Sequence, residues 1–197
     1  MKVVKFALMG MFAASLFSGC AVTKAYVDLG YTSAEAATAV DGAKNISLSV
    51  NMNDAREVKD KISCKKNGYG MEMAAIMSKQ DVPGLVKSAI VEELQKRGFN
   101  VSDVKQGLQI DLTKVYNDFK IGMWSGSAVA DVTFMVQVKK SDGSIILVKN
   151  YAGKNAQKGL QLCSPKHAQN AINAALTDVV KNLFEDKEFI AALLKTN

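Results

Sequence analysis

His167 is the only histidine in the 197-residue chain, so it is the first residue to consider for acid–base chemistry. A general base at this position needs a nucleophile, and Cys163 and Ser164 precede it closely in the sequence. Ser164, however, stands directly before Pro165 and an apolar periodic segment, which is the pattern of a helix N-cap. The chain contains no GxSxG, HExxH or P-loop motif. We therefore expect a non-enzyme without catalytic residues or a cofactor, in which His167 is an ordinary surface residue.

Cys20 ends a segment that has the organisation of an export signal. Two lysines stand near its start, residues 6–17 form an apolar run, and Ser18 and Gly19 precede the cysteine. The run is shorter than the ~20 residues that span a bilayer as a helix. Residues 1–19 are therefore interpreted as a signal peptide.

The residues around Cys20 resemble the bacterial lipobox, in which a cysteine is lipidated and becomes the first residue of the mature protein. Ser18 and Gly19 match this motif, whereas Phe17 stands where leucine is commoner. The resemblance implies a lipid anchor on Cys20. Ala21 after it implies transfer to the outer membrane, facing the periplasm, rather than retention in the inner membrane. The alternatives are an ordinary cleaved signal or a buried N-terminal helix.

Cys64 and Cys163 are the two cysteines of the exported part of the chain. In an oxidising compartment an even pair favours a disulfide, which here closes a loop of about 100 residues. Both lie in polar, turn-like stretches, where surface loops can meet. Two separate thiols are the alternative. We expect no metal site, because His167 and two distant cysteines do not have the spacing of zinc ligands.

The composition is that of an ordinary globular protein. Hydrophobic residues make up 48% of the chain and charged residues 22%. These values exclude a disordered tail, a collagen-like repeat and a multi-pass membrane protein. We assign residues 20–44 to a lipidated N-terminus, a tether and a possible edge strand, and residues 45–197 to a single α+β periplasmic domain.

The net charge is only mildly basic. It falls from +6 to +4 when residues 1–19 are removed, because that segment contains two lysines and no acidic residue. The lysines between positions 59 and 66 are interleaved with acidic residues, so this stretch is interpreted as a solvated face. Nucleic-acid binding needs a basic stripe with aromatic platforms. We expect no nucleic-acid partner.

Hydrophobic spacing predicts two helices. The first is capped by Asp81 and ends at Gly98. The second begins after Ser164 and carries apolar residues at i, i+3, i+4 and i+7 spacing as far as Leu183. Residues 188–194 extend the second helix or form a short third one.

Alternating apolar residues predict strands at 46–52, 108–112, 128–138 and 145–151. Short turns between consecutive strands favour antiparallel pairing. The predicted fold class is α+β, with a mainly antiparallel sheet of four to five strands and two helices packed on one face. Residues 53–80 are predicted to form a loop that places Met71, Met73 and Met77 in the core, with an adaptable binding surface as the alternative.

Trp124 is the only tryptophan of the chain, and it lies in a Gly/Ser loop between two predicted strands. An aromatic side chain in such a loop is a suitable contact anchor. The alternative is that it fills a gap under the sheet. Met123, Trp124 and Ser125 are therefore predicted to belong to a partner-binding surface.

Several local sequence matches, in order and with consistent spacing, resemble the YajG-type lipoproteins of Gram-negative bacteria. The resemblance covers residues 26–194. It is carried by Asp54-Ala55-Arg56, Arg97-Gly98-Phe99, Val115-Tyr116, Asn150-Tyr151, residues 174–178 and Phe189-Ile190. It implies a fold and an envelope location but no mechanism, and Cys64 and Cys163 are not part of the family pattern.

These observations predict a lipid-anchored envelope lipoprotein without enzymatic activity. Its expected contacts are the membrane, through the lipid anchor, and an envelope protein on which it docks as an accessory module. The alternative is a protein that binds a small molecule or a lipid between helices and sheet. That alternative requires the segment with Met71, Met73 and Met77 to act as a lid.

Overall fold

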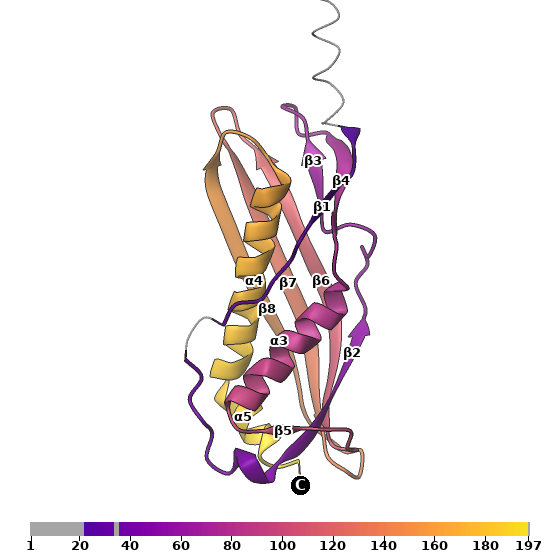
Figure 1. Ribbon diagram of the computed structural model, residues 1–197, viewed down its shortest axis with the longest axis vertical. Helices are drawn as coiled ribbons and strands as arrows, with labels where there is room; N and C mark the ends of the chain where they lie inside the picture. Colours follow the sequence, from indigo (N-terminus) through magenta and orange to yellow (C-terminus); the bar gives the residue numbers. More distant parts are fainter. Residues whose placement is uncertain (1–21, 34–35, 197) are drawn as a thin grey trace, which may run out of the picture.

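The computed structural model describes residues 22–33 and 36–196 of the chain (Figure 1). The predicted signal peptide and Cys20 lie outside this part. The described residues form two sheets and three α-helices, with a short 3-10 helix, η1, at Ala43–Asn45. The predicted α+β fold class is confirmed.

The larger sheet has five strands in the order β5-β2-β6-β7-β8. Its strands are β2 (Ser47–Asp54), β5 (Asn100–Val101), β6 (Gly107–Ile121), β7 (Gly126–Lys139) and β8 (Ile145–Leu160). β6, β7 and β8 pair antiparallel, whereas β2 pairs parallel to both β5 and β6. On β7 every second residue from Ala128 to Val138 is fully buried, because a strand turns alternate side chains toward the core.

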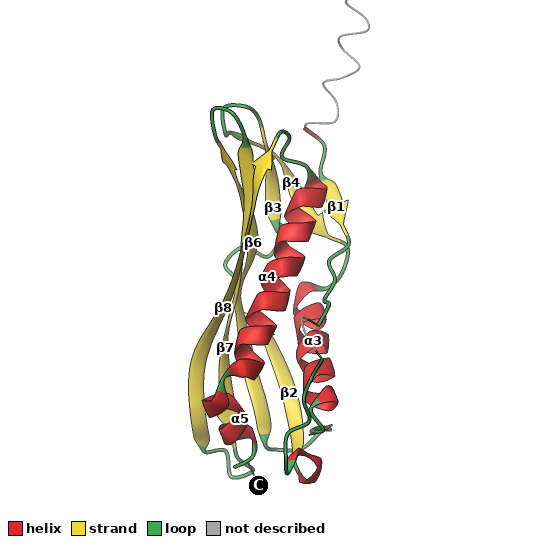
Figure 2. Ribbon diagram, turned by 90° about the vertical axis from the view of Figure 1, so that its left-hand side faces the viewer, coloured by secondary structure: helices red, strands yellow, loops and turns green. Residues whose placement is uncertain are grey.

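Three helices cover one face of this sheet, as Figure 2 shows from the side. They are α3 (Val82–Lys96), α4 (Pro165–Glu185) and α5 (Lys187–Leu193). Asp81 caps α3 by accepting a hydrogen bond from the backbone N–H of Gly84 at 3.0 Å. Both main helices therefore begin where their polar caps and prolines predict, and the core lies between them and the sheet.

A second sheet of three strands lies beside the first, in the order β1-β4-β3. It consists of β1 (Ala25–Val27), β3 (Ser63–Lys66) and β4 (Glu72–Ser78), and β1 occupies an edge. The prediction of a loop over residues 53–80 was therefore wrong. These strands are short and carry few buried residues, so their alternation is too weak to detect in the sequence.

The elongated molecule has two distinct ends (Figure 1). The described chain begins at one end, which also carries the β3–β4 turn, the β6–β7 turn and the β8–α4 loop. We call it the N-terminal end. The opposite end carries the β7–β8 turn and the C-terminus. No helix in the described ranges is long and apolar enough to cross a membrane.

Candidate functional site

The tip of the β6–β7 hairpin presents two large side chains to solvent. The backbone N–H of Gly122 donates to the carbonyl oxygen of Ser125 at 3.1 Å, so Met123 and Trp124 are the two central residues of the turn. Their exposures are 91% and 88%. Trp124 therefore does not fill a gap under the sheet. The structure places all three predicted contact residues, including exposed Ser125, at the N-terminal end.

The β3–β4 turn presents a second aromatic side chain at the same end. The side-chain oxygen of Asn67 accepts hydrogen bonds from the backbone N–H groups of Tyr69 and Met71, at 3.0 and 3.1 Å. This turn holds Tyr69 outward with 91% of its surface exposed, and Met71 is also exposed. Sequence reasoning missed Tyr69, although its position between Gly68 and Gly70 is a turn signal.

The β8–α4 loop adds Leu162, which is 78% exposed. The following residues form a capping box, in which the backbone N–H of His167 donates to Ser164 Oγ at 3.4 Å and the backbone N–H of Ser164 donates to His167 Nδ1 at 3.5 Å. His167 Nδ1 also lies 3.0 Å from the carbonyl oxygen of Leu162. His167 thus shapes the start of α4 and the loop before it. Among the residues that the structure describes, no group of three His, Cys, Asp or Glu side chains could hold a metal ion.

The three loops meet around one open cleft of about 310 Å³. Its lining includes Ile121, Met123, Trp124 and Leu162. We name the exposed apolar side chains of these loops the apolar apex: Tyr69, Met71, Ile121, Met123, Trp124 and Leu162. Half of the large hydrophobic residues that are exposed in the described part belong to it, so this end is the main apolar surface of the molecule.

Lysines surround the apolar apex. Lys66 Nζ lies 2.5 Å from an Asp118 carboxylate oxygen and 2.9 Å from the carbonyl oxygen of Phe119, and Lys120 also pairs with Asp118. Burial opposes ionisation of Asp118, but hydrogen bonds from Lys120 and Lys66 outweigh it and lower the pKa of this carboxyl. Lys158 and Lys166 lie on β8 and at the start of α4, at the same end. Positive charge is in excess here.

The structure does not join Cys64 to Cys163, and both are free thiols. Cys64 lies buried on β3, with its sulfur 3.2 Å from the carbonyl oxygen of Ala74. Cys163 lies in the β8–α4 loop, where its sulfur packs beside Gly126 at the start of β7. Burial raises the pKa of both thiols. Cys64 lies on β3 of the three-stranded sheet, whereas Cys163 lies in a loop beside the start of β7, and the structure leaves them as two separate thiols.

The Asp54-Ala55-Arg56 step forms a partly buried ion pair at the end of β2. Arg56 Nε and Nη2 donate to the two carboxylate oxygens of Asp54 at 2.8 and 2.9 Å. The hydrogen bond from Arg56 lowers the pKa of Asp54. This geometry gives the step a structural role in holding the chain as it leaves the larger sheet.

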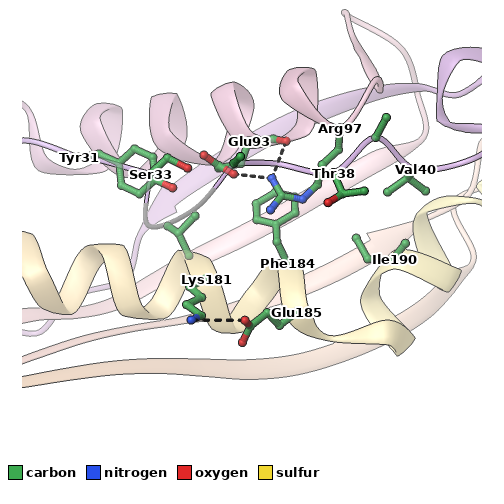
Figure 3. Close-up of a pocket in the computed structure, with 13 residues that line it drawn as sticks. Tyr31, Ser33, Thr38, Val40, Glu93, Arg97, Lys181, Phe184, Glu185 and Ile190 are labelled. Carbon is green, nitrogen blue, oxygen red and sulfur yellow. Dashed lines mark hydrogen bonds and ion pairs between the residues drawn. The ribbon is translucent and has the colours of Figure 1, made fainter.

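A second cavity, of about 300 Å³, lies between α3, α4 and the segment before η1 (Figure 3). Glu93 on α3 is only 2% exposed and pairs with Arg97 one turn later. The Arg97 guanidinium lies over the ring of Phe184 on α4, 4.3 Å from its centroid. Met71, Met73 and Met77 are not among the lining residues, so they form no lid over this cavity.

The charged side chains that line this second cavity form ion pairs with one another, Glu93 with Arg97 and Lys181 with Glu185. Burial opposes ionisation of Glu93, but hydrogen bonds from Ser33, Arg97 and Tyr31 outweigh it and lower the pKa of its carboxyl. Burial and the nearby Glu93 charge raise the pKa of Tyr31. The network joins α3, α4 and the N-terminal segment, which is a structural role, so we place the candidate functional site at the apolar apex.

A family model described as "Uncharacterized lipoprotein" matches residues 33–194 of the sequence. No curated protein matches. A crystal structure of a Xanthomonas campestris protein of the DUF330 family is 14% identical, with a TM-score of 0.52 over 81% of this chain and 92% of that one. A minor lipoprotein from Acinetobacter baumannii is 8% identical, with a TM-score of 0.47 over 74% and 94%. The first likeness shows a shared fold.

Proposed function

The chain belongs to this family of YajG-type lipoproteins, and from that premise we propose that it is a non-enzymatic module, anchored by a lipid on Cys20, that docks on another envelope component. Membership of the family makes it an envelope lipoprotein. The docking role, the outer-membrane location and the periplasmic orientation are our proposal. The observation that carries the docking role is the exposure of Met123 and Trp124 at the tip of a hairpin that nothing in the described chain covers.

The lipid anchor is tested with Cys20→Ala. Acyl chains on Cys20 exceed the two-chain requirement for stable membrane attachment. We therefore expect the variant to lose the mass of the acyl groups and to leave the membrane fraction, as measured by intact-mass spectrometry and fractionation. Cys163→Ala is the control, because this cysteine lies outside the lipobox, and it is expected to keep both properties. An unchanged mass and unchanged attachment of Cys20→Ala would contradict the anchor.

The docking surface is tested by photo-crosslinking in intact cells. A photoreactive amino acid replaces Trp124, and the matched control carries it at Ser141, an exposed position in the β7–β8 turn at the opposite end. We expect the probe at position 124 to form one defined adduct, which mass spectrometry identifies as protein or phospholipid. The probe at position 141 is expected to form none. Identical adduct patterns at the two positions would overturn the proposal.

A further inference from the structure

We infer that the component on which the apolar apex docks is the bilayer surface that holds the protein's own lipid anchor. This inference rests on the proposed function and names the partner of the same surface. The apolar side chains of the apex enter the boundary between headgroups and acyl chains, and the surrounding lysines contact anionic phospholipid headgroups. In this arrangement the N-terminal end contacts the membrane, and the long axis of the domain points away from the membrane surface.

The position of the anchor requires the apex to lie near the bilayer. Cys20 is only three residues before Thr23, and Thr23 is held by a hydrogen bond of 3.0 Å from Lys65 on β3 to its carbonyl oxygen. Three extended residues span at most ~11 Å. The lipid on Cys20 thus attaches almost directly to the end that carries the β3–β4 turn (Figure 1). Residues 20–44 were expected to include a tether, but β1 and several residues after it pack against the core. Little of this segment is therefore left to separate the domain from Cys20.

The chemistry of the apex matches the interfacial zone of a membrane. Tryptophan and tyrosine concentrate at membrane–water interfaces, where an apolar ring and a polar group are both satisfied. Trp124 and Tyr69 are the two most exposed aromatic residues of the described part, and both lie at loop tips of the anchored end. Met123, Met71 and Leu162 supply further apolar surface beside them. These side chains project from three separate loops, as insertion into a planar surface requires.

The charge around the apex complements an anionic lipid surface. Lys120, Lys158 and Lys166 are exposed at this end, whereas Lys66 is largely buried against Asp118. The acidic residues there, Asp118 and Glu72, are each paired with a lysine. Basic residues close to a membrane are attracted by anionic headgroups over about one Debye length, which is ~8 Å at physiological ionic strength. An apolar surface with lysines around it is the arrangement expected of a protein that binds an anionic phospholipid surface.

The opposite end has no exposed aromatic side chain in its turn, although Lys139 and Lys140 precede the turn and the half-exposed Ile145 follows it. The β7–β8 turn consists of polar residues, and its Asp142 carboxylate accepts hydrogen bonds from the backbone N–H and the hydroxyl of Ser144, at 2.8 and 2.6 Å. Its side chains bind one another and leave no apolar loop tip at positions 140–144. The two ends therefore differ in their aromatic residues: the two most exposed aromatic side chains lie in the loops of the N-terminal end, and none lies in the β7–β8 turn.

The single tryptophan of the protein makes the test direct, because its fluorescence reports only on position 124. The full-length lipoprotein is reconstituted into vesicles of phosphatidylcholine and phosphatidylglycerol, with and without bromine atoms on the upper acyl chain. Bromine quenches tryptophan only at short range. We expect brominated lipid to cause a clear loss of the emission, because an interfacial tryptophan lies close to the upper acyl chain, and aqueous acrylamide to quench it weakly.

The matched control combines Trp124→Phe with Ser141→Trp, which moves the fluorophore to the opposite end and leaves the anchor in place. In this variant we expect strong quenching by acrylamide and none by brominated lipid. If the emission of Trp124 instead behaves like that of the control, the bilayer inference is overturned. A protein adduct at position 124 in cells would then leave the proposed docking role intact, and the absence of any adduct would overturn both. A chain that fails to enter the vesicles would overturn the lipid anchor and the inference with it.

Discussion

Gly153→Ala is expected to destabilise the protein by about 3 kcal/mol, the upper end of the usual range for an overpacked core. Gly153 lies on β8 exactly where α4 crosses the sheet. A Cβ atom at this position would come within 2.8 Å of the Val179 Cβ and would overlap the carbonyl oxygen of Ala175. Both residues belong to the middle of α4 and are fully buried. Backbone atoms of a packed helix cannot move aside as the end of a flexible side chain can, so the helix has to shift.

Thermal unfolding followed by circular dichroism measures this effect. A loss of about 3 kcal/mol corresponds to a decrease in Tm of roughly 10 °C for a domain of this size. Gly68→Ala is the matched control, because a Cβ at Gly68 has no neighbour within 4 Å. It should leave Tm nearly unchanged. Equal Tm values for Gly153→Ala and the parent protein would mean that α4 does not approach β8 as closely as described.

Arg97→Met is expected to cost about 3 kcal/mol at neutral pH, because it removes the guanidinium that neutralises the buried Glu93 carboxylate and leaves it the neutral hydrogen-bond donors Ser33 and Tyr31. Methionine keeps much of the volume that packs against Phe184, so the expected loss comes chiefly from the unpaired charge. Lys96 stays 3.4 Å from the carboxylate but is partly exposed and replaces the guanidinium only weakly. We therefore expect a large decrease in the free energy of unfolding, although Arg97 lies outside the apolar apex.

The loss should depend on pH, with a sign that identifies its cause. In the parent protein the pKa of Glu93 lies below its ordinary value of 4.5, so the ionised carboxyl adds stability above that pH and loses it as the pH falls through the lowered pKa. In the variant the guanidinium no longer offsets the effect of burial, so we expect the pKa of Glu93 to rise relative to that in the parent protein. The carboxyl then becomes neutral on mild acidification, and the difference in stability between the two proteins shrinks.

Urea unfolding at pH 7 and pH 4 tests this expectation. The control is Lys96→Met, whose side chain is partly exposed and pairs mainly with exposed Glu92, and it should cost less than about 1 kcal/mol. A loss of equal size for Arg97→Met at both pH values would assign the role of Arg97 to packing against Phe184 instead of to neutralising Glu93.

The helices and the central strands could be predicted because their signals are local. Asp81 and Ser164 cap the two main helices, and the apolar alternation from Ala128 to Val138 identifies β7 and its buried face. The prediction of mainly antiparallel pairing holds for β6, β7 and β8 but missed the parallel pairs of β2. Parallel pairing depends on which strands a distant crossover brings together, and no local residue specifies this.

The candidate site could be predicted only at the β6–β7 turn, where the sequence indicates Met123, Trp124 and Ser125. Trp124 stands out in the sequence as a lone aromatic residue in a turn, but Tyr69 and Leu162 are unremarkable where they occur. They lie near Trp124 because the β3–β4 turn, the β6–β7 turn and the β8–α4 loop all lie at the N-terminal end of the molecule. The structure does not form the predicted disulfide, because Cys64 packs beside Ala74 on β4 and Cys163 packs beside Gly126 at the start of β7. These neighbours depend on the tertiary fold and could not be read from the sequence.

By itself the sequence determined the family resemblance, the helix caps and the α+β class, and it predicts an export signal and a lipid anchor on Cys20. All of these depend on neighbouring residues along the chain or on the period of one element. Only the tertiary structure decided that Glu93 is buried against Arg97, that Arg97 lies over Phe184, that α4 lies directly on Gly153, and that half of the exposed apolar residues gather at the N-terminal end. These features arise from contacts between segments that are distant in sequence, and such contacts are set by how the helices and sheets pack on one another.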